Sequence, residues 1–323
     1  GDCETRTFLH DVPVVRAAAA DGLANGLADA LADALADGLA RRKGAVVLDE
    51  ANGTVLLAAH GSVGPEQCFV TASSLCFAGF VLFFSELLAL LRTGGADAAR
   101  LDAAARVLEH LPEQRTDPPG LDEGPFTGEA AALAAMARAG RATVDYGLVD
   151  SYFGNVSCLV GDTVYISQTG SSLDELEGVI DACPVDGSRT VGLTASSELA
   201  AHMAVYGCSD ARVILHGHPR FTVIASMDCG VADCPRRGRC HVACTAQRSV
   251  AGVPVVPGEV GGGATGLCHT MPPAAADAGA AVVLGHGLFA TGRRDFREAF
   301  AAMLRVEAEC RDACLARVRA ALG

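Results

Sequence analysis

ARVILHGHPRF, residues 211–221, ends an apolar run in two histidines that stand two positions apart. The run favours a buried strand, and on a strand residues i and i+2 face the same side. His216 and His218 can therefore offer two imidazoles to one metal ion. A second apolar strand, 281–284, leads into His286, which would complete three nitrogen ligands and leave positions open for substrate. Three unrelated histidines at strand ends are the alternative interpretation.

A helix is expected from Thr194 to Tyr206, in the stretch TASSELAAHMAVY. Small hydroxyl residues at its start can cap the free backbone N–H groups, and such a terminus can receive an anion such as a phosphate. Glu198 lies in the predicted first turn, where a carboxylate either complements the helix dipole or serves as an acid–base group. His202, four residues later, shares its face and either pairs with it or fills space.

The rest of the second half alternates helices and strands without a strict strand–helix–strand rhythm. This pattern predicts an α/β fold with a mixed central sheet covered by helices. The expected elements are a helix over 129–146, strands around 154–157 and over 163–167, an extended segment over 253–257, a helix over 272–278 and a final helix over 295–321.

The first half predicts an additional amino-terminal α/β domain. Leucines recur every four residues from Leu23 to Leu39, which indicates a helix, and two apolar runs around Asn52-Gly53 indicate a β-hairpin. Two further helices are expected over 74–92 and 97–110. Residues 111–128 are rich in Pro, Gly and charge, so we expect domains of residues 1–118 and 119–323.

Two features of the first half allow other interpretations. Residues 69–91 are apolar enough to be tested as a membrane span, but they contain Glu86 and several hydroxyl residues, so a buried helix is expected. ADGLARRKGAVVL at 36–48 resembles AADAGAAVVLGHG at 275–287, which raises the hypothesis that the first domain is a degenerate half-copy of the second.

Composition excludes several classes of partner. The formal net charge of −13 opposes binding to nucleic acid or to anionic membrane, because both need a basic surface. A small-molecule substrate is therefore expected. Thirteen cysteines without a signal-peptide pattern favour reduced thiols or metal ligands and a cytoplasmic location.

Four of these cysteines lie in a short insertion after His218: Cys229, Cys234, Cys240 and Cys244. Four thiolates could close a second, structural metal site, although the spacing differs from the common paired zinc motif. An iron–sulfur cluster, free thiols or a redox disulfide are the alternatives. Several arginines make the insertion basic, which suits either a lid that attracts an anionic substrate or a solvated loop.

Five ordered motifs make the second half resemble the class II aldolase and adducin-like family, which includes fuculose-phosphate aldolases and ribulose-phosphate 4-epimerases. The motifs are GLVDSYFGNVS (147–157), TVYISQTGSSLDEL (163–176), TASSELAAHMAVY (194–206), ARVILHGHPRF (211–221) and VVLGHGLFATG (282–292). The resemblance covers roughly residues 128 to 318.

The resemblance implies roles for particular residues. His216, His218 and His286 would bind a divalent ion, usually zinc, with manganese or iron as alternatives, and Glu198 would transfer a proton. The implied phosphate-binding residues are Asn155, Thr169, Gly170, Ser196 and Ser197. Family sites are commonly completed by a further tyrosine, and no tyrosine of this sequence is assigned to that role.

The implied function is that of a metal-dependent lyase, a class II aldolase in a homo-oligomer. It would cleave or form a C–C bond of a phosphorylated ketose, or a similar hydroxy-keto compound, through a metal-stabilised enediolate. A sugar-phosphate epimerase, a dehydratase or a non-catalytic adducin-like scaffold are the alternatives.

Overall fold

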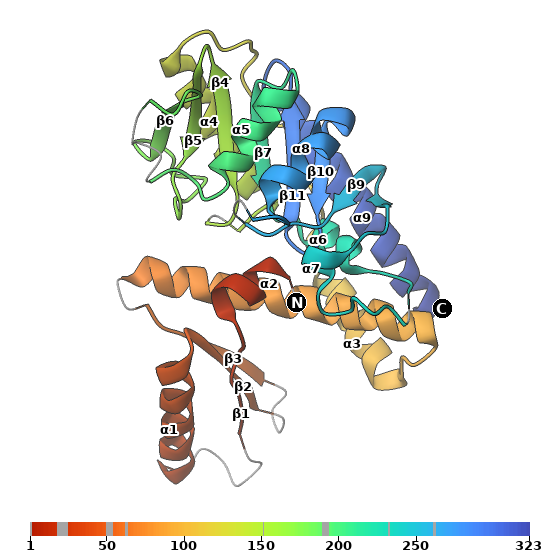
Figure 1. The fold of residues 1–323 in the computed structure, drawn as a ribbon. Coiled ribbons are helices and arrows are strands. Elements are labelled where there is room, and N and C mark those ends of the chain that lie inside the picture. Colours follow the sequence, from red (N-terminus) through yellow and green to blue (C-terminus); the bar gives the residue numbers. More distant parts are fainter. Residues whose placement is uncertain are drawn as a thin grey trace. The chain divides into compact units, whose positions relative to one another are not determined.

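The computed structural model describes residues 2–17, 25–49, 54–61, 64–150, 152–188, 194–231, 233–260 and 263–323 (Figure 1). It divides into two compact units, Gly1–Leu82 and Phe83–Gly323, and each is described by itself. The division falls inside helix α2 (Pro65–Thr93). The domain boundary at residues 118 and 119 stays a prediction.

The first unit contains a three-stranded sheet in the order β1-β2-β3, on which helix α1 packs. β1 runs parallel to β2, and β2 is antiparallel to β3. The predicted leucine helix and hairpin are present, while Leu23 and the Asn52-Gly53 turn lie outside the described residues. The elements are a short π-helix (Thr5–Leu9), β1 (Val14–Ala17), α1 (Asn25–Arg41), β2 (Gly44–Asp49) and β3 (Thr54–Ala59).

Helix α2 begins nine residues earlier than predicted, at Pro65, because proline fits the first turn of a helix. It is long and apolar enough to cross a membrane by length and composition, and 39% of its most apolar window is buried. Phe77 and Phe84 are 1% exposed, whereas Phe69 and Leu82 are each 58% exposed. The helix therefore buries one side, as a core helix does, and also presents large apolar side chains.

The second unit confirms the predicted mixed sheet. Among its described residues, eight strands lie in the order β6-β5-β4-β7-β11-β10-β9-β8, and only the β9–β10 pair is parallel. The strands are β4 (Asn155–Val160), β5 (Thr163–Ser167), β6 (Ile180–Pro184), β7 (Val213–Gly217), β8 (Arg248–Val250), β9 (Val253–Val256), β10 (Ala280–Val283) and β11 (Gly287–Gly292).

Helices cover both faces of this sheet. α5 and α8 pack on one face, where Ile166, Val205, Ile214, Met271 and Phe289 share a buried core, and α9 lies behind the sheet (Figure 1). The helices are α3 (Ala98–His110), α4 (Glu129–Asp145), α5 (Leu199–Cys208), α6 (Arg220–Met227), α7 (Cys240–Ala243), α8 (Leu267–Ala278) and α9 (Phe296–Leu322).

The start of α5 differs from the prediction. Ala195 forms a β-bridge with Gln168, and Ser196 N–H donates to Ser167 O at 3.0 Å, so these residues are extended and the helix begins only at Leu199. Pairing with a distant strand end therefore overrides the local helical pattern.

Candidate metal centre

Strand β7 places His216 in the middle of the sheet. All five residues of the strand are buried, and it pairs antiparallel with β4 on one side and β11 on the other. In that register His216 lies between Asn155 and Phe289. His218 follows directly after the strand, two residues from His216, as the sequence predicts.

A tight hairpin loop between β10 and β11 carries His286, whose N–H donates to Val283 O at 2.9 Å. The next residue, Gly287, is where the hairpin comes against β7. A Cβ atom there would lie 2.3 Å from Gly217 O and within 3 Å of the His216 and His218 rings. Only glycine allows this approach, and the approach brings His286 to the other two histidines.

The three imidazoles form a compact buried set. Each of His216, His218 and His286 offers a ligand atom within 4.8 Å of the others, and their ring centroids are 4.9 to 5.1 Å apart. The side chains are 1% to 5% exposed. Within the described residues, no other group of three or more His, Cys, Asp or Glu side chains converges in this way.

The protonation states of His216 and His218 suit a metal ion. Burial, reinforced by the charge at His286, holds the pKa of His216 and of His218 well below its usual range, so both rings are neutral. The Nδ1 of His216 donates to Leu288 O at 3.1 Å, which leaves its Nε2 as a lone-pair donor. Phe289 stacks on the same ring at 3.8 Å and keeps it in place. The donor set therefore fits a divalent ion that prefers nitrogen ligands.

Glu198 is the carboxylate beside this set. It is 5% exposed, with Oε2 3.4 Å from His216 Nε2 and Oε1 3.3 Å from His286 Nε2. Burial raises the pKa of Glu198, while the charge at His286 and a hydrogen bond from Asn155 partly offset that rise. A carboxyl group in this environment can hold or release a proton closer to neutral pH than an exposed one.

Asn155 joins Glu198 to the next part of the site. Its Nδ2 donates to Glu198 Oε2 at 2.7 Å and to Ser196 Oγ at 3.1 Å. Because Nδ2 is engaged with the carboxylate, the remaining polar atom is Oδ1, which is buried without a hydrogen-bond partner. Asn155 thus orients Glu198 and leaves an acceptor for a hydroxyl or N–H group of a ligand.

The other predicted anion-binding residues lie on two bridged segments. Thr169 N–H donates to Thr194 O and Thr169 Oγ1 donates to Ala195 O, both at 2.9 Å. Gly170 has a φ of 75° and is exposed, as is Ser197. The structure therefore brings residues 167–169 beside residues 194–196, which lead into Glu198 at the start of α5.

His202 does not pair with Glu198. Its Nδ1 bonds to Ser157 Oγ at 2.7 Å, and Ser157 Oγ also bonds to Tyr206 Oη at 2.7 Å. Burial lowers the pKa of His202 to about 3, so it is neutral. His202, Tyr206 and Ser157 form a buried polar cluster that is separate from the Glu198 carboxylate.

The cysteine insertion is unlike the histidine set. Cys229, Cys234, Cys240 and Cys244 are all half-buried free thiols. Within the described residues no three of them converge as metal ligands. A second metal site there stays a prediction, and binding would require the insertion to rearrange.

Two residues that hold the site together carry no signal in the sequence pattern. Phe289 is one of many apolar strand residues, and Ser226 lies within the apolar helix α6, yet Ser226 Oγ accepts from the N–H of Gly285 beside His286 at 2.8 Å. Only the pairing of distant segments reveals these contacts.

Comparison with known proteins agrees with this architecture. The family model for the class II aldolase and adducin N-terminal domain matches residues 134–314. The match spans more than half of the chain, so the chain belongs to the class II aldolase and adducin family, as the motifs predicted. Membership gives it an aldolase-family function.

Solved structures with a similar chain include L-fuculose-1-phosphate aldolase from Thermus thermophilus, at 24% identity, covering 60% of this chain and 98% of that chain, with a TM-score of 0.48. YgbL from Escherichia coli is 20% identical, covering 57% of this chain and 88% of that chain, with a TM-score of 0.46. No curated protein matches the chain.

Proposed function

We propose that this protein is a metal-dependent lyase that cleaves or forms a C–C bond of a phosphorylated ketose or a similar hydroxy-keto compound. The observation that carries the proposal is the convergence of three buried imidazoles, His216, His218 and His286, with the Glu198 carboxylate 3.3 to 3.4 Å from two of them. A packing cluster needs no such arrangement, because buried polar groups are costly unless they are used or paired.

His216, His218 and His286 would hold the divalent ion, with zinc as the first choice for three nitrogen donors and manganese or iron as alternatives. Bound there, the ion would act as a Lewis acid that polarises a substrate carbonyl and leaves open positions for substrate oxygens. The low pKa of His216 and of His218 lets them bind it without first losing a proton.

Glu198 would move a proton to or from the carbon beside that carbonyl. Its position next to His216 and His286 places it against a substrate held at the centre. The Asn155 amide fixes one carboxylate oxygen, and burial raises the pKa of Glu198 toward the range in which both protonation states are accessible.

The anionic end of the substrate would lie over the bridged segments. The N–H groups of Gly170 and Ser197 and the hydroxyls of Ser196 and Ser197 would be the donors there, close to the start of α5, where a helix terminus favours negative charge. Thr169 would have to give up its bonds to Thr194 O and Ala195 O before it could donate to the substrate. The free Oδ1 of Asn155 is an acceptor, so Asn155 would receive a substrate hydroxyl more readily than a phosphate oxygen. As in the family, we expect a homo-oligomer.

The test compares wild type, Glu198→Gln and Glu309→Gln with a panel of ketose phosphates. Glu309 is an exposed carboxylate on α9 that pairs with Arg305, and it serves as a matched control. We expect Glu198→Gln to keep its metal and lose activity by about 10²- to 10⁴-fold, because only the proton-transfer group is removed.

Aldehyde release is followed by coupled reduction, and epimers or dehydration products by NMR. An aldehyde product supports the lyase. An epimer or a dehydrated product would replace it with one of the other family reactions. Metal-loaded wild type that transforms no sugar phosphate would favour a scaffold instead.

A further inference from the structure

Helix α6 connects the two segments that carry the candidate ligands. It begins directly after His218, with Pro219 as its N-cap, so the His216–His218 segment leads straight into it. Its last turn contacts the hairpin loop of His286, where the N–H of Gly285 donates to Ser226 Oγ at 2.8 Å. The same helix therefore contacts both the segment that carries His216 and His218 and the loop that carries His286.

The Ser226 hydroxyl makes two hydrogen bonds at once. It donates to Val223 O at 2.7 Å and accepts from the N–H of Gly285. The hydroxyl hydrogen is therefore directed at Val223 O, and the oxygen lone pair at Gly285. Ser226 is fully buried, and water cannot readily replace either bond. Gly285 has a φ of 66°, a conformation that other residues rarely adopt, and it immediately precedes His286.

The amino end of α6 is anchored to α9. The buried carboxylate of Glu307 accepts from the N–H groups of Phe221 and Thr222 at 2.9 and 2.8 Å, and from the Thr222 hydroxyl at 2.8 Å. These bonds satisfy N–H groups that the first turn of a helix leaves free. The start of α6, two residues beyond His218, is thereby fixed.

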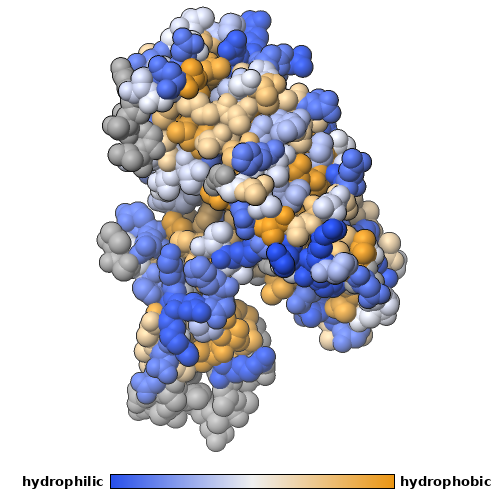
Figure 2. Space-filling view, viewed as in Figure 1, coloured by the Kyte–Doolittle hydropathy of each residue, from blue (hydrophilic) through white to orange (hydrophobic). Residues whose placement is uncertain are grey.

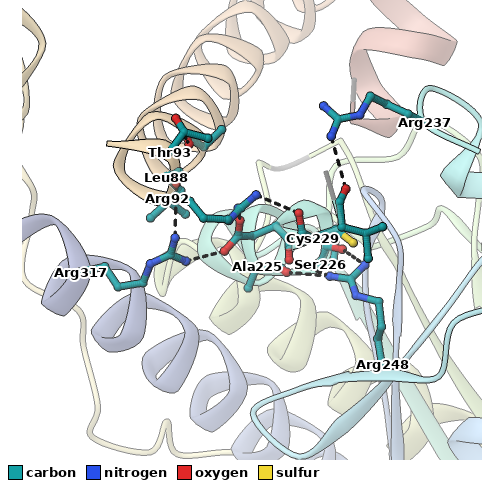
Figure 3. A network of polar contacts seen from close by, with 12 residues as sticks. Leu88, Arg92, Thr93, Ala225, Ser226, Cys229, Arg237, Arg248 and Arg317 are labelled. Atoms are coloured by element: carbon teal, nitrogen blue, oxygen red, sulfur yellow. Dashed lines mark hydrogen bonds and ion pairs between the residues drawn. The ribbon is translucent and has the colours of Figure 1, made fainter. Parts of the chain in front are cut away.

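The carboxy end is anchored by arginines (Figure 3). Arg248 donates to Ser226 O at 2.8 Å and to Asp228 O at 3.0 Å, which satisfies carbonyls at the end of the helix. Arg92 and Arg317 both pair with the Asp228 carboxylate. The last turn of α6, which carries Ser226, is thus held by Arg248, Arg92 and Arg317. A hydrogen bond from Gly285 to Ser226 therefore restrains the loop that carries His286.

We propose that Ser226 is a positioning residue that holds the Gly285–His286 turn so that the His286 imidazole stays within reach of His216 and His218. The inference rests on the proposed function in that the three histidines bind a divalent ion. Ser226 itself would touch neither the ion nor the substrate. Partners that hydrogen-bond the metal ligands directly commonly contribute about 10- to 100-fold to metal affinity, and Ser226 bonds the residue that immediately precedes one of them.

The test uses the full chain with Ser226→Ala, which removes the hydroxyl, and Thr143→Val as a matched control. Thr143 is also fully buried, and its hydroxyl donates to Ala139 O within helix α4 at 2.7 Å. Both variants lose a buried hydroxyl and should lower the denaturation midpoint of the metal-free protein. Only Ser226→Ala should change the metal centre.

Zn²⁺ affinity is measured by competition with a chromophoric chelator, and the visible spectrum of the Co²⁺-loaded protein reports ligand geometry. We expect the Zn²⁺ Kd of Ser226→Ala to rise about 10- to 100-fold, with an altered Co²⁺ spectrum and with Thr143→Val unchanged. A Ser226→Ala protein that binds Zn²⁺ and Co²⁺ as wild type does would overturn the proposal.

Hydrogen exchange of the metal-free protein separates this inference from the proposed function. In wild type the Gly285 amide should be protected, and in Ser226→Ala it should exchange about tenfold faster or more while β7 is unchanged. Fast exchange of Gly285 in wild type overturns the positioning role even if Ser226→Ala fails to fold. If the Gly285 amide is protected but the protein binds no metal, the hydrogen bond to Ser226 is supported and the proposed metal centre is contradicted.

Discussion

Residues 12–93 and 253–322 share one order of elements. The first region runs β1–α1–β2–β3–α2 and the second β9–α8–β10–β11–α9, and in each a parallel strand pair is followed by an antiparallel one. Val-Pro-Val-Val occurs at 12–15 and 253–256, and Ala-Val-Val-Leu at 45–48 and 281–284. The registers also agree, because Val14 pairs with Val46 as Val255 pairs with Val282. This agreement supports the half-copy hypothesis, which stays a prediction.

The two regions differ at the outer edge of the third strand. β11 pairs along its outer edge with a further strand, β7, which carries His216. In contrast, β3 is the last strand of its sheet among the described residues. Leu288 is fully buried, while Leu57, at the same register position, is 42% exposed, and apolar surface is visible over this sheet (Figure 2). Gly287 corresponds in register to Leu56. The hairpin between the second and third strands of each region therefore forms a candidate site only in the second region, where Gly287 lets β7 approach β11.

The largest expected effect is loss of the metal from the second region alone. His216→Ala, His218→Ala should abolish the roughly one equivalent of divalent ion expected in wild type, because two of three ligands are removed. His60→Ala, which changes the exposed histidine that follows β3, should retain it.

Elemental analysis after dialysis measures the metal, with a Cys234→Ser, Cys240→Ser variant beside the histidine variants. An equivalent that survives in the histidine double variant but disappears from the cysteine variant would place the metal in the insertion.

A smaller effect is expected from adding one methyl group at Gly287, where β11 approaches β7. Gly287→Ala places a Cβ 2.3 Å from Gly217 O, so β11 and β7 must separate. We expect a loss of about 3 kcal/mol in the free energy of unfolding, together with weakened metal binding.

Denaturant titration of the metal-free protein measures that loss. Leu56→Ala, at the corresponding register position of the first region, should cost less than about 1 kcal/mol because Leu56 is 55% exposed. Equal losses in the two variants would contradict the comparison.

The smallest expected effect concerns the helices that end each region. Burial raises the pKa of Glu307 on α9 to about 7, despite the hydrogen bonds from Phe221 and Thr222, whereas the buried part of α2 contains mostly apolar groups. A raised pKa means that the folded state holds the proton more tightly. The contribution of Glu307 to stability is therefore greatest below its unfolded pKa of about 4.5 and is lost as pH rises through about 7.

The expected decrease for Glu307 alone is about 2 kcal/mol between pH 5 and pH 7. Denaturant titrations at several pH values should show that Glu307→Gln removes this part of the slope. A slope that is unchanged in Glu307→Gln would show that the carboxylate is ionised throughout.

Much of the fold could be predicted because periodicity is a local property. Helices α3, α4 and α9 and strands β5, β7 and β10 lie within a residue or two of their predicted positions. The prediction was wrong where distant pairing decides, as at the start of α5, where Ala195 bridges Gln168. The elements β6, β11 and α6 were not predicted, because β6 ends in a proline, β11 begins and ends in glycine, and these residues are typical of turns, while α6 spans only eight residues.

The sequence by itself determined the family, the mixed α/β class and the identity of the histidines and Glu198 as candidates, because these follow from residue type and order. Only the tertiary structure decided that His286 meets His216, that the side chain of Asn155 rather than that of His202 bonds the Glu198 carboxylate, and that the four cysteines of the insertion do not converge among the described residues. Strand order and backbone approach set distances between residues far apart in the chain, and spacing along a sequence does not encode them.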